Sequence, residues 1–149
     1  MRHVLILVVE DTEEDVELLK IALRKTQSKN PIQVAHDGQE AIDYLCGSGK
    51  FADRQTYPFP GVIFLDLKLP RLDGLEVLKW LKEHDQCKVM PVMVLTSSAL
   101  PSDVKSAYQL GANCYMVKPG GLEELKNLVE LTFRFWSMCL IPTLPNKCC

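Results

Sequence analysis

The sequence lacks a strong excess of charge of either sign, and it lacks any long hydrophobic run. Its 17 basic and 19 acidic side chains leave a formal net charge of −2, without a cluster of Lys and Arg. Binding to nucleic acid or to an anionic membrane needs such a cluster. No stretch approaches the roughly 18 apolar residues of a membrane span, and the apolar run 4–9 is short for a signal peptide. We therefore expect a cytoplasmic protein that binds neither nucleic acid nor membranes directly.

The sequence also lacks a paired-cysteine motif. Its six cysteines include no C-x-x-C, so neither a zinc site nor a thioredoxin-like motif is indicated. The cysteines in apolar segments are expected to be small buried side chains, and Cys87 lies in a polar turn. Because the chain is apolar enough to fold without disulfides, Cys148 and Cys149 are interpreted as incidental exposed thiols.

Apolar runs of strand length alternate with helical patterns along the chain. Its 149 residues, 47% of them hydrophobic, suffice for one domain with a substantial core. The expected strands cover 4–9, 32–35, 62–67, 92–96 and 112–117. The expected helices follow Thr12, cover 38–46, centre on 75–81, run from 101 to 111 and run from 122 to about 139. Strands alternating with helices predict an α/β fold, an open, doubly wound parallel sheet with helices on both faces.

Chemically active side chains follow four of the predicted strands. The first strand ends in Glu10 and Asp11, the third runs into Asp66, the fourth ends in Thr96, and the fifth in Lys118. In a doubly wound sheet, ligands bind beyond the carboxyl ends of the strands. We therefore expect three carboxylates, a hydroxyl and an ammonium at one edge of the sheet.

This set of groups limits the chemistry of the site. Three carboxylates within a few ångströms repel one another, so at neutral pH they need a cation or raised pKa values. A ligand set of oxygens without His or Cys suits Mg²⁺ better than zinc. A carboxylate beside Mg²⁺, with an ammonium and a hydroxyl nearby, is equipped to accept a phosphoryl group. Each residue taken singly is an ordinary turn, cap or strand residue, so it is their convergence that favours this function.

The segments that carry these residues resemble a known family. Leu7–Asp11, Phe64–Pro70, Val94–Ser98 and Tyr115–Pro119 are similar to the receiver domain of two-component response regulators. The aspartate, threonine and lysine at the strand ends are 30 and 22 residues apart, and both intervals match the family's spacing. The resemblance spans roughly residues 4–139. It implies five helices around a five-stranded sheet of order 2-1-3-4-5.

The resemblance also implies roles for the acidic residues. Asp66 would be the phosphoacceptor that attacks the phosphohistidine of a sensor histidine kinase. Asp11 would bind Mg²⁺ directly, Glu10 would assist through water, and the backbone carbonyl of Lys68 would supply a further ligand. Thr96 would donate a hydrogen bond to a phosphoryl oxygen. The protein would then be a regulator, catalysing only its own phosphorylation and dephosphorylation.

Two further roles follow from the resemblance at the fifth strand. Lys118 would form an ion pair with the phosphate, and its peptide bond to Pro119 is expected to be cis, as is common in the family. Tyr115 occupies the family's aromatic switch position, where the ring turns inward as Thr96 moves toward the phosphate.

The predicted domain organisation is a receiver domain over 1–139 and a C-terminal tail over 140–149, without an output domain. Two features resemble the small regulators that partner bacterial phytochrome kinases. One is the long loop 47–61, and the other is the aromatic end of the last helix with its Pro-Leu-Pro-like tail. A phytochrome kinase is therefore the expected partner class.

The aromatic residues Phe133, Phe135 and Trp136 also bear on oligomeric state. They follow one another too closely to share one helix face, so at least one should be exposed or covered by a partner. Members of this small-regulator group are often homodimers through the face formed by the fourth helix, the fifth strand and the fifth helix. We expect such a homodimer here.

Three alternatives stay open beside this interpretation. A phosphatase of the haloacid-dehalogenase type needs a second Asp two residues after Asp66, where this chain has Lys68. A flavodoxin-like carrier needs a phosphate loop after the first strand, but residues 10–14 carry four carboxylates that would repel phosphate. Neither a dinucleotide fingerprint nor a Walker A motif is present. The third alternative is a receiver used as a docking module without phosphorylation.

Overall fold

The computed structural model describes residues 4–26 and 29–149; residues 1–3, with which the predicted receiver domain begins, lie outside the described residues. Strands and helices alternate along the chain. The elements are β1 (Leu5–Val9), α1 (Glu13–Lys25), β2 (Ile32–Ala35), α2 (Gly38–Cys46), a 3-10 turn η1 (Gly49–Ala52), β3 (Pro60–Leu65), α3 (Gly74–Glu83), β4 (Val92–Thr96), α4 (Pro101–Gln109), β5 (Cys114–Val117) and α5 (Leu122–Ser137).

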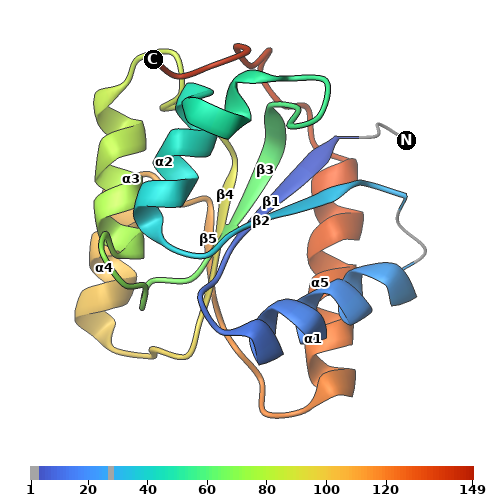
Figure 1. Ribbon diagram of the computed structural model, residues 1–149. Coiled ribbons are helices and arrows are strands. Elements are labelled where there is room, and N and C mark those ends of the chain that lie inside the picture. The colour runs from blue at the N-terminus through green and yellow to red at the C-terminus, as the bar shows by residue number, and fades with distance from the viewer. Residues whose placement is uncertain (1–3, 27–28) are drawn as a thin grey trace.

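The five strands form one parallel sheet of order β2-β1-β3-β4-β5, which confirms the predicted fold class. Helices α1 and α5 cover one face, and α2, α3 and α4 cover the other (Figure 1). The register aligns the carboxyl ends, since Val9 lies beside Ala35 of β2 and Leu65 of β3. Thr96 of β4 lies beside Val117 of β5. Residues that follow β1, β3, β4 and β5 therefore emerge at one edge.

The sheet has a hydrophobic core on each face because successive strand residues point to opposite sides. Leu7 and Val9 belong to the cluster under α2, α3 and α4, whereas Ile6 and Val8 belong to the cluster under α1 and α5. All of β1 is buried, as expected for a parallel strand between two helix layers. Because β1 packs against helices on both faces of the sheet, the position of its carboxyl end, which precedes residues of the candidate site, is well defined.

The predicted long loop 47–61 is packed rather than open. It contains η1 and places Phe51 and Tyr57 against Tyr44 of α2, with ring centroids 4.9 and 6.1 Å from the Tyr44 ring. The Tyr44 hydroxyl donates to the carbonyl oxygen of Pro58 at 2.8 Å. The strand after this loop begins at Pro60 and ends at Leu65, two residues earlier at each end than the sequence predicted.

The three aromatic residues near the end of α5 divide between core and surface. Phe133 and Trp136 are 8% and 7% exposed and pack with Phe64 in the core under α1 and α5. Phe135 is 68% exposed. The expectation that at least one of them is exposed is confirmed. The predicted place of Phe133 and Trp136 in an interface is wrong, because the helix period turns both side chains inward. For Phe135 the interface stays a prediction.

The cysteines correct the sequence interpretation most clearly. Cys46 at the end of α2 forms a disulfide with Cys149, and Cys87 forms one with Cys148. The Cα atoms are 4.9 and 5.7 Å apart, within the range that a disulfide needs. Residues 140–149 fold back onto the domain, where the Cys148 N–H donates to the Leu45 carbonyl oxygen at 2.9 Å. Cys148 and Cys149 are therefore not incidental exposed thiols.

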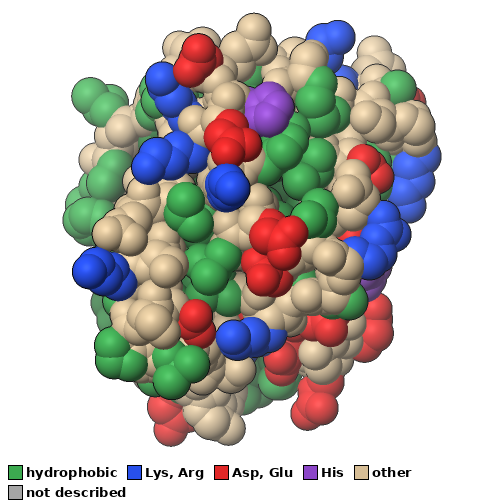
Figure 2. Space-filling model, turned by 90° about the vertical axis from the view of Figure 1, so that its left-hand side faces the viewer, with side chains coloured by type: hydrophobic (Ala, Val, Ile, Leu, Met, Phe, Trp, Pro, Cys, Tyr) green, Lys and Arg blue, Asp and Glu red, His purple; other side chains and the backbone are tan. Residues whose placement is uncertain are grey.

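The molecular surface carries no single-sign patch on the side formed by α3 and α4. Acidic, basic and hydrophobic side chains are interspersed there (Figure 2). No helix in the described part of the chain is long and apolar enough to cross a membrane.

Candidate functional site

The carboxyl edge of the sheet gathers three carboxylates. Glu10 and Asp11 directly follow β1, and Asp66 directly follows β3. Backbone hydrogen bonds extend the sheet to this point, since the Asp66 N–H donates to the Val9 carbonyl oxygen at 3.0 Å. Glu10 and Asp66 are buried and Asp11 is exposed. Ligand oxygens of all three lie within 4.8 Å of one another.

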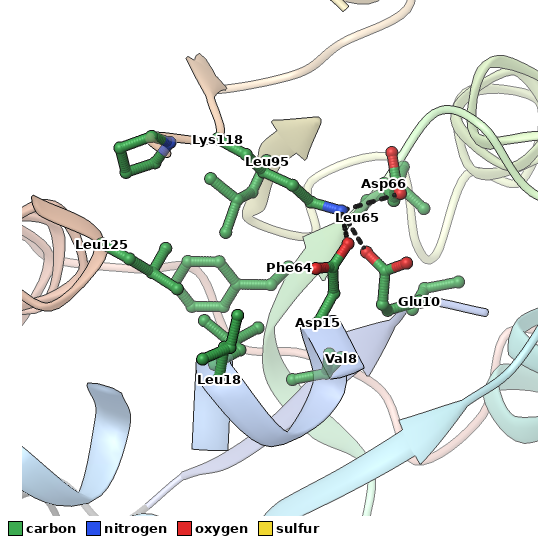
Figure 3. Close-up of a pocket in the computed structure, with 13 residues that line it drawn as sticks. Val8, Glu10, Asp15, Leu18, Phe64, Leu65, Asp66, Leu95, Lys118 and Leu125 are labelled. Carbon is green, nitrogen blue, oxygen red and sulfur yellow. Dashed lines mark hydrogen bonds and ion pairs between the residues drawn. The ribbon is translucent and has the colours of Figure 1, made fainter. Parts of the chain in front are cut away.

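The ammonium of Lys118 lies among the carboxylates of Glu10, Asp15 and Asp66 (Figure 3). Its Nζ is 2.6 Å from Glu10 Oε2 and 3.1 Å from Asp66 Oδ2. A third bond, of 2.8 Å, joins it to Oδ2 of Asp15 in the first turn of α1. The Lys118 N–H donates to the Thr96 carbonyl oxygen, which holds the residue at the end of β5. One ammonium thus bonds three carboxylates in a partly buried site.

Burial and this cation set the charge states. Burial raises the pKa of Glu10 to about 7, although the bond from Lys118 opposes the rise. Burial also disfavours the charged form of Asp66, but the nearby Thr96 hydroxyl and the Lys118 ammonium outweigh it and hold the pKa of that carboxyl below its usual value. Burial alone would lower the pKa of Lys118, yet its bonds to Asp15 and Glu10 raise it. At neutral pH the site offers an ionised Asp66 beside a charged Lys118.

The hydroxyl of Thr96, the last residue of β4, is the other polar group of the site. The residue is completely buried, and its Oγ1 lies close enough to Asp66 to lower the pKa of that carboxyl but makes no hydrogen bond of standard geometry within the described structure. A buried hydroxyl without a partner is costly. It is therefore well suited to donate to an oxygen of a group that binds at Asp66.

Tyr115 of β5 is tied to the loop that follows β4. Its hydroxyl donates to the Ser98 carbonyl oxygen at 2.8 Å. The hydroxyl of Ser98 in turn bonds Asp103 of α4 at 2.6 Å. Tyr115 is half-buried and packs against the core under α2, α3 and α4. A displacement of this loop would therefore also move the Tyr115 ring and α4, to which these hydrogen bonds connect it.

The loop between β3 and α3 shapes the entrance to the site. The Lys68 N–H donates to Asp66 Oδ1 at 3.2 Å, and Asp73 caps α3 by accepting from the Glu76 N–H at 2.9 Å. An open groove beside the acidic cluster is lined by Asp11 and residues 67–70, among others. On the other face of the sheet from this groove, a small apolar pocket between α1 and α5 extends to Lys118 and Pro119.

The structure differs from the sequence predictions at two positions of the site. The Lys118–Pro119 peptide bond is trans, not cis as expected. A helix follows Thr12 as expected, but the Thr12 side chain makes no capping hydrogen bond, and the Asp15 carboxylate in the first turn binds Lys118, a contact that the sequence analysis did not predict. The helical position of Asp15, one residue before the buried Val16, was the available indication that it faces the sheet edge.

Known proteins are similar to this chain in sequence and in fold. A family model described as the response regulator receiver domain matches residues 6–130. Response regulator Rcp1 of Synechocystis sp. is 36% identical over 131 residues, 88% of this chain and 87% of Rcp1.

Solved structures agree with these sequence matches. The crystal structure of the phosphorylated cyanobacterial phytochrome response regulator RcpA has a TM-score of 0.87 at 34% identity, covering 95% of this chain and 100% of that chain. The Mn²⁺-bound form of Rcp1 has a TM-score of 0.84 at 34% identity, covering 94% of this chain and 99% of that chain. The predicted receiver fold is confirmed, and this chain belongs to the response regulator receiver family, whose members act in two-component signalling.

Proposed function

We propose that Asp66 accepts a phosphoryl group from the phosphohistidine of a sensor histidine kinase. The observation that carries this proposal is the pairing of a buried, ionised Asp66 with the Lys118 ammonium, beside the unpartnered Thr96 hydroxyl. An Asp66 carboxylate oxygen would attack phosphorus, the bond from phosphorus to the histidine nitrogen would break, and the imidazole would leave. Lys118 and Thr96 would bind oxygens of the new acyl phosphate.

The acidic cluster fits a divalent cation of the magnesium type. Its ligands are carboxylate oxygens, without nitrogen or sulfur, and they lie close enough together to hold one ion, directly or, for Glu10, through water. Glu10, Asp11, Asp66 and the Lys68 backbone carbonyl would hold the ion. When bound, Mg²⁺ neutralises charge on phosphoryl oxygens. The Mn²⁺-bound form of the relative Rcp1 supports this assignment.

Acetyl phosphate, a small phosphoryl donor, tests the proposed function without a kinase. We expect the intact mass of the protein to rise by one phosphoryl group when acetyl phosphate and Mg²⁺ are both present. Removal of Mg²⁺ with a chelator should abolish the gain, because three carboxylates would then repel the anionic donor. A gain of equal rate and extent in the chelator would contradict the metal assignment. Failure of both acetyl phosphate and a beryllofluoride titration would favour the docking-module alternative.

Asp15 should slow this phosphorylation. It lies 2.8 Å from Lys118 Nζ, closer than Asp66 does, and it adds a fourth carboxylate to Glu10, Asp11 and Asp66 where the donor must approach. Its side chain is 37% exposed, so solvent screens the charge and reduces its interaction energy with the site to about 1 kcal/mol. Asp15→Asn should therefore raise the rate of mass gain roughly 3- to 10-fold. Glu14→Gln, the same charge change on an exposed neighbouring residue of α1, is the matched control. Equal rates for the two variants would show that Asp15 does not compete for Lys118.

The proposed signal leaves the domain through protein contacts on the face of α4, β5 and α5. Tyr115 would act as the switch, because it joins this face to the loop after β4. Large exposed hydrophobic side chains lie on the same elements: Tyr108, Val117, Leu131 and Phe135. We propose that they form a homodimer interface, in which Phe135 is the aromatic contact.

The kinase partner is proposed to be a phytochrome. Support comes from RcpA, which is described as a cyanobacterial phytochrome response regulator. The division into a receiver over 1–139 and a tail over 140–149, the cytoplasmic location and the absence of nucleic-acid binding remain predictions.

A further inference from the structure

Residues 140–149, called the strap below, connect the two faces of the sheet. After α5 ends at Ser137, the strap crosses the edge where the strands begin and reaches α2 and α3 (Figure 1). Ile141 packs against the core under α1 and α5, whereas Leu144 packs against the core under α2, α3 and α4. The strap therefore lies over both halves of the core, at the end of the sheet opposite to Asp66.

Few noncovalent contacts hold the strap in place. Six of its ten residues are exposed, and Leu140 is completely so. Its apolar contacts come from Ile141, Leu144 and the buried Cys148, and its backbone is anchored by the hydrogen bond from the Cys148 N–H to the Leu45 carbonyl oxygen. Two disulfides also attach the strap covalently to the domain. The disulfides are therefore the covalent part of the attachment between the strap and the domain.

The two disulfides differ in their access to solvent. In the pair Cys46–Cys149, called the outer disulfide, Cys149 is exposed and Cys46 is half-buried. In the pair Cys87–Cys148, called the inner disulfide, the residues are 0% and 5% exposed. Thiol–disulfide exchange requires in-line access of a thiolate to a sulfur atom. A reductant therefore reaches the outer disulfide first.

The four disulfide-bonded cysteines are not arranged as a metal site. Among the described residues, the acidic cluster is the one group of three or more potential ligands brought close enough to hold an ion. The sulfur atoms instead lie in two pairs, which join the strap to Cys46 at the end of α2 and to Cys87 in the turn after α3. The arrangement favours redox chemistry over zinc binding.

We propose that the attachment of the strap to the domain is controlled by redox state. A dithiol reductant first reduces the outer disulfide and then the inner disulfide, and the strap is released. A thiolate of the reductant attacks Sγ of Cys149, and Cys46 leaves as a thiolate. The second thiol of the reductant then resolves the mixed disulfide and releases Cys149. Lifting of this end exposes the inner disulfide to the same two steps. In the reverse direction, each cysteine pair is oxidised by a low-molecular-weight disulfide, which is reduced to two thiols. This inference does not depend on the proposed phosphorylation.

Native titration with dithiothreitol tests the proposed order. Thiols are trapped by alkylation at each dose and located by peptide mass mapping. We expect Cys46 and Cys149 to be labelled at least about tenfold faster than Cys87 and Cys148. Trypsin cleavage after Lys147 gives a second readout, because it removes the dipeptide 148–149 from the reduced protein alone. Equal labelling rates for the two pairs would overturn the proposal.

Cysteine variants separate the order of release from general unfolding. Cys149→Ser removes the outer disulfide, so Cys87 and Cys148 should be labelled at doses that leave them intact in the unsubstituted chain. Cys139→Ser makes the same change outside both disulfides and should leave the titration unaltered. Oxidation of the reduced protein with glutathione disulfide should restore both pairs with unchanged circular dichroism. Persistently free thiols, or a bound zinc ion in the native mass, would contradict the proposal.

Discussion

An Asp66→Asn variant should gain no phosphoryl group from acetyl phosphate, whether or not Mg²⁺ is present. The amide cannot act as the nucleophile that an ionised carboxylate provides. The substitution keeps the shape of the side chain and leaves Lys118 and Thr96 in place. The loss therefore tests the nucleophile itself rather than the packing around it. Intact mass after a fixed incubation is the measurement.

Asp73→Asn is the matched control for this loss. Asp73 lies on the same loop and caps α3 with its side chain. Asn caps a helix about as well as Asp does, so both the fold and the mass gain should be retained. If Asp66→Asn still gained one phosphoryl group, the acceptor would be another carboxylate, and fragmentation of the phosphorylated protein would locate it.

The sheet and the positions of the strand ends could be predicted well from the sequence. The ranges 32–35, 38–46 and 92–96 agree with β2, α2 and β4 at both ends. The reason is physical, since strands buried on both faces become uninterrupted apolar runs, and Gly or Pro marks the turns between them. Once the strands are aligned in parallel, the residues that follow them must meet at one edge. The convergence of Glu10, Asp66 and Lys118 therefore followed from local patterns alone.

Contacts between residues that are far apart in the sequence could not be predicted in the same way. The partner of Asp15 is Lys118, 103 residues away, and helical spacing does not specify such a contact. The disulfides depend on the course of the strap, which carries little periodicity of its own. Cys87 in its polar turn gave no indication of complete burial, because the strap that covers it folds back from 61 residues further along the chain.

Gly74→Ala should destabilise the domain by about 2–3 kcal/mol, because overpacking against backbone atoms cannot be relieved by a rotamer change. A Cβ at this position would overlap the Asp66 carbonyl oxygen and lie 2.7 Å from Leu67 Cα. The Gly74 N–H also donates to the Leu67 carbonyl oxygen, which closes the loop after β3. Thermal melting should show a decrease in Tm of roughly 5–10 °C.

Gly120→Ala distinguishes this steric effect from a general sensitivity of glycines near the site. Gly120 lies two residues after Lys118, and a Cβ there meets no atom within 4 Å. Its Tm should therefore stay within about 1–2 °C of the unsubstituted chain. Because the overlap at Gly74 falls on the Asp66 backbone, that variant should also be phosphorylated more slowly at temperatures where it is fully folded. A stable Gly74→Ala protein with normal phosphorylation would mean that the loop after β3 can move away from α3 without disturbing Asp66.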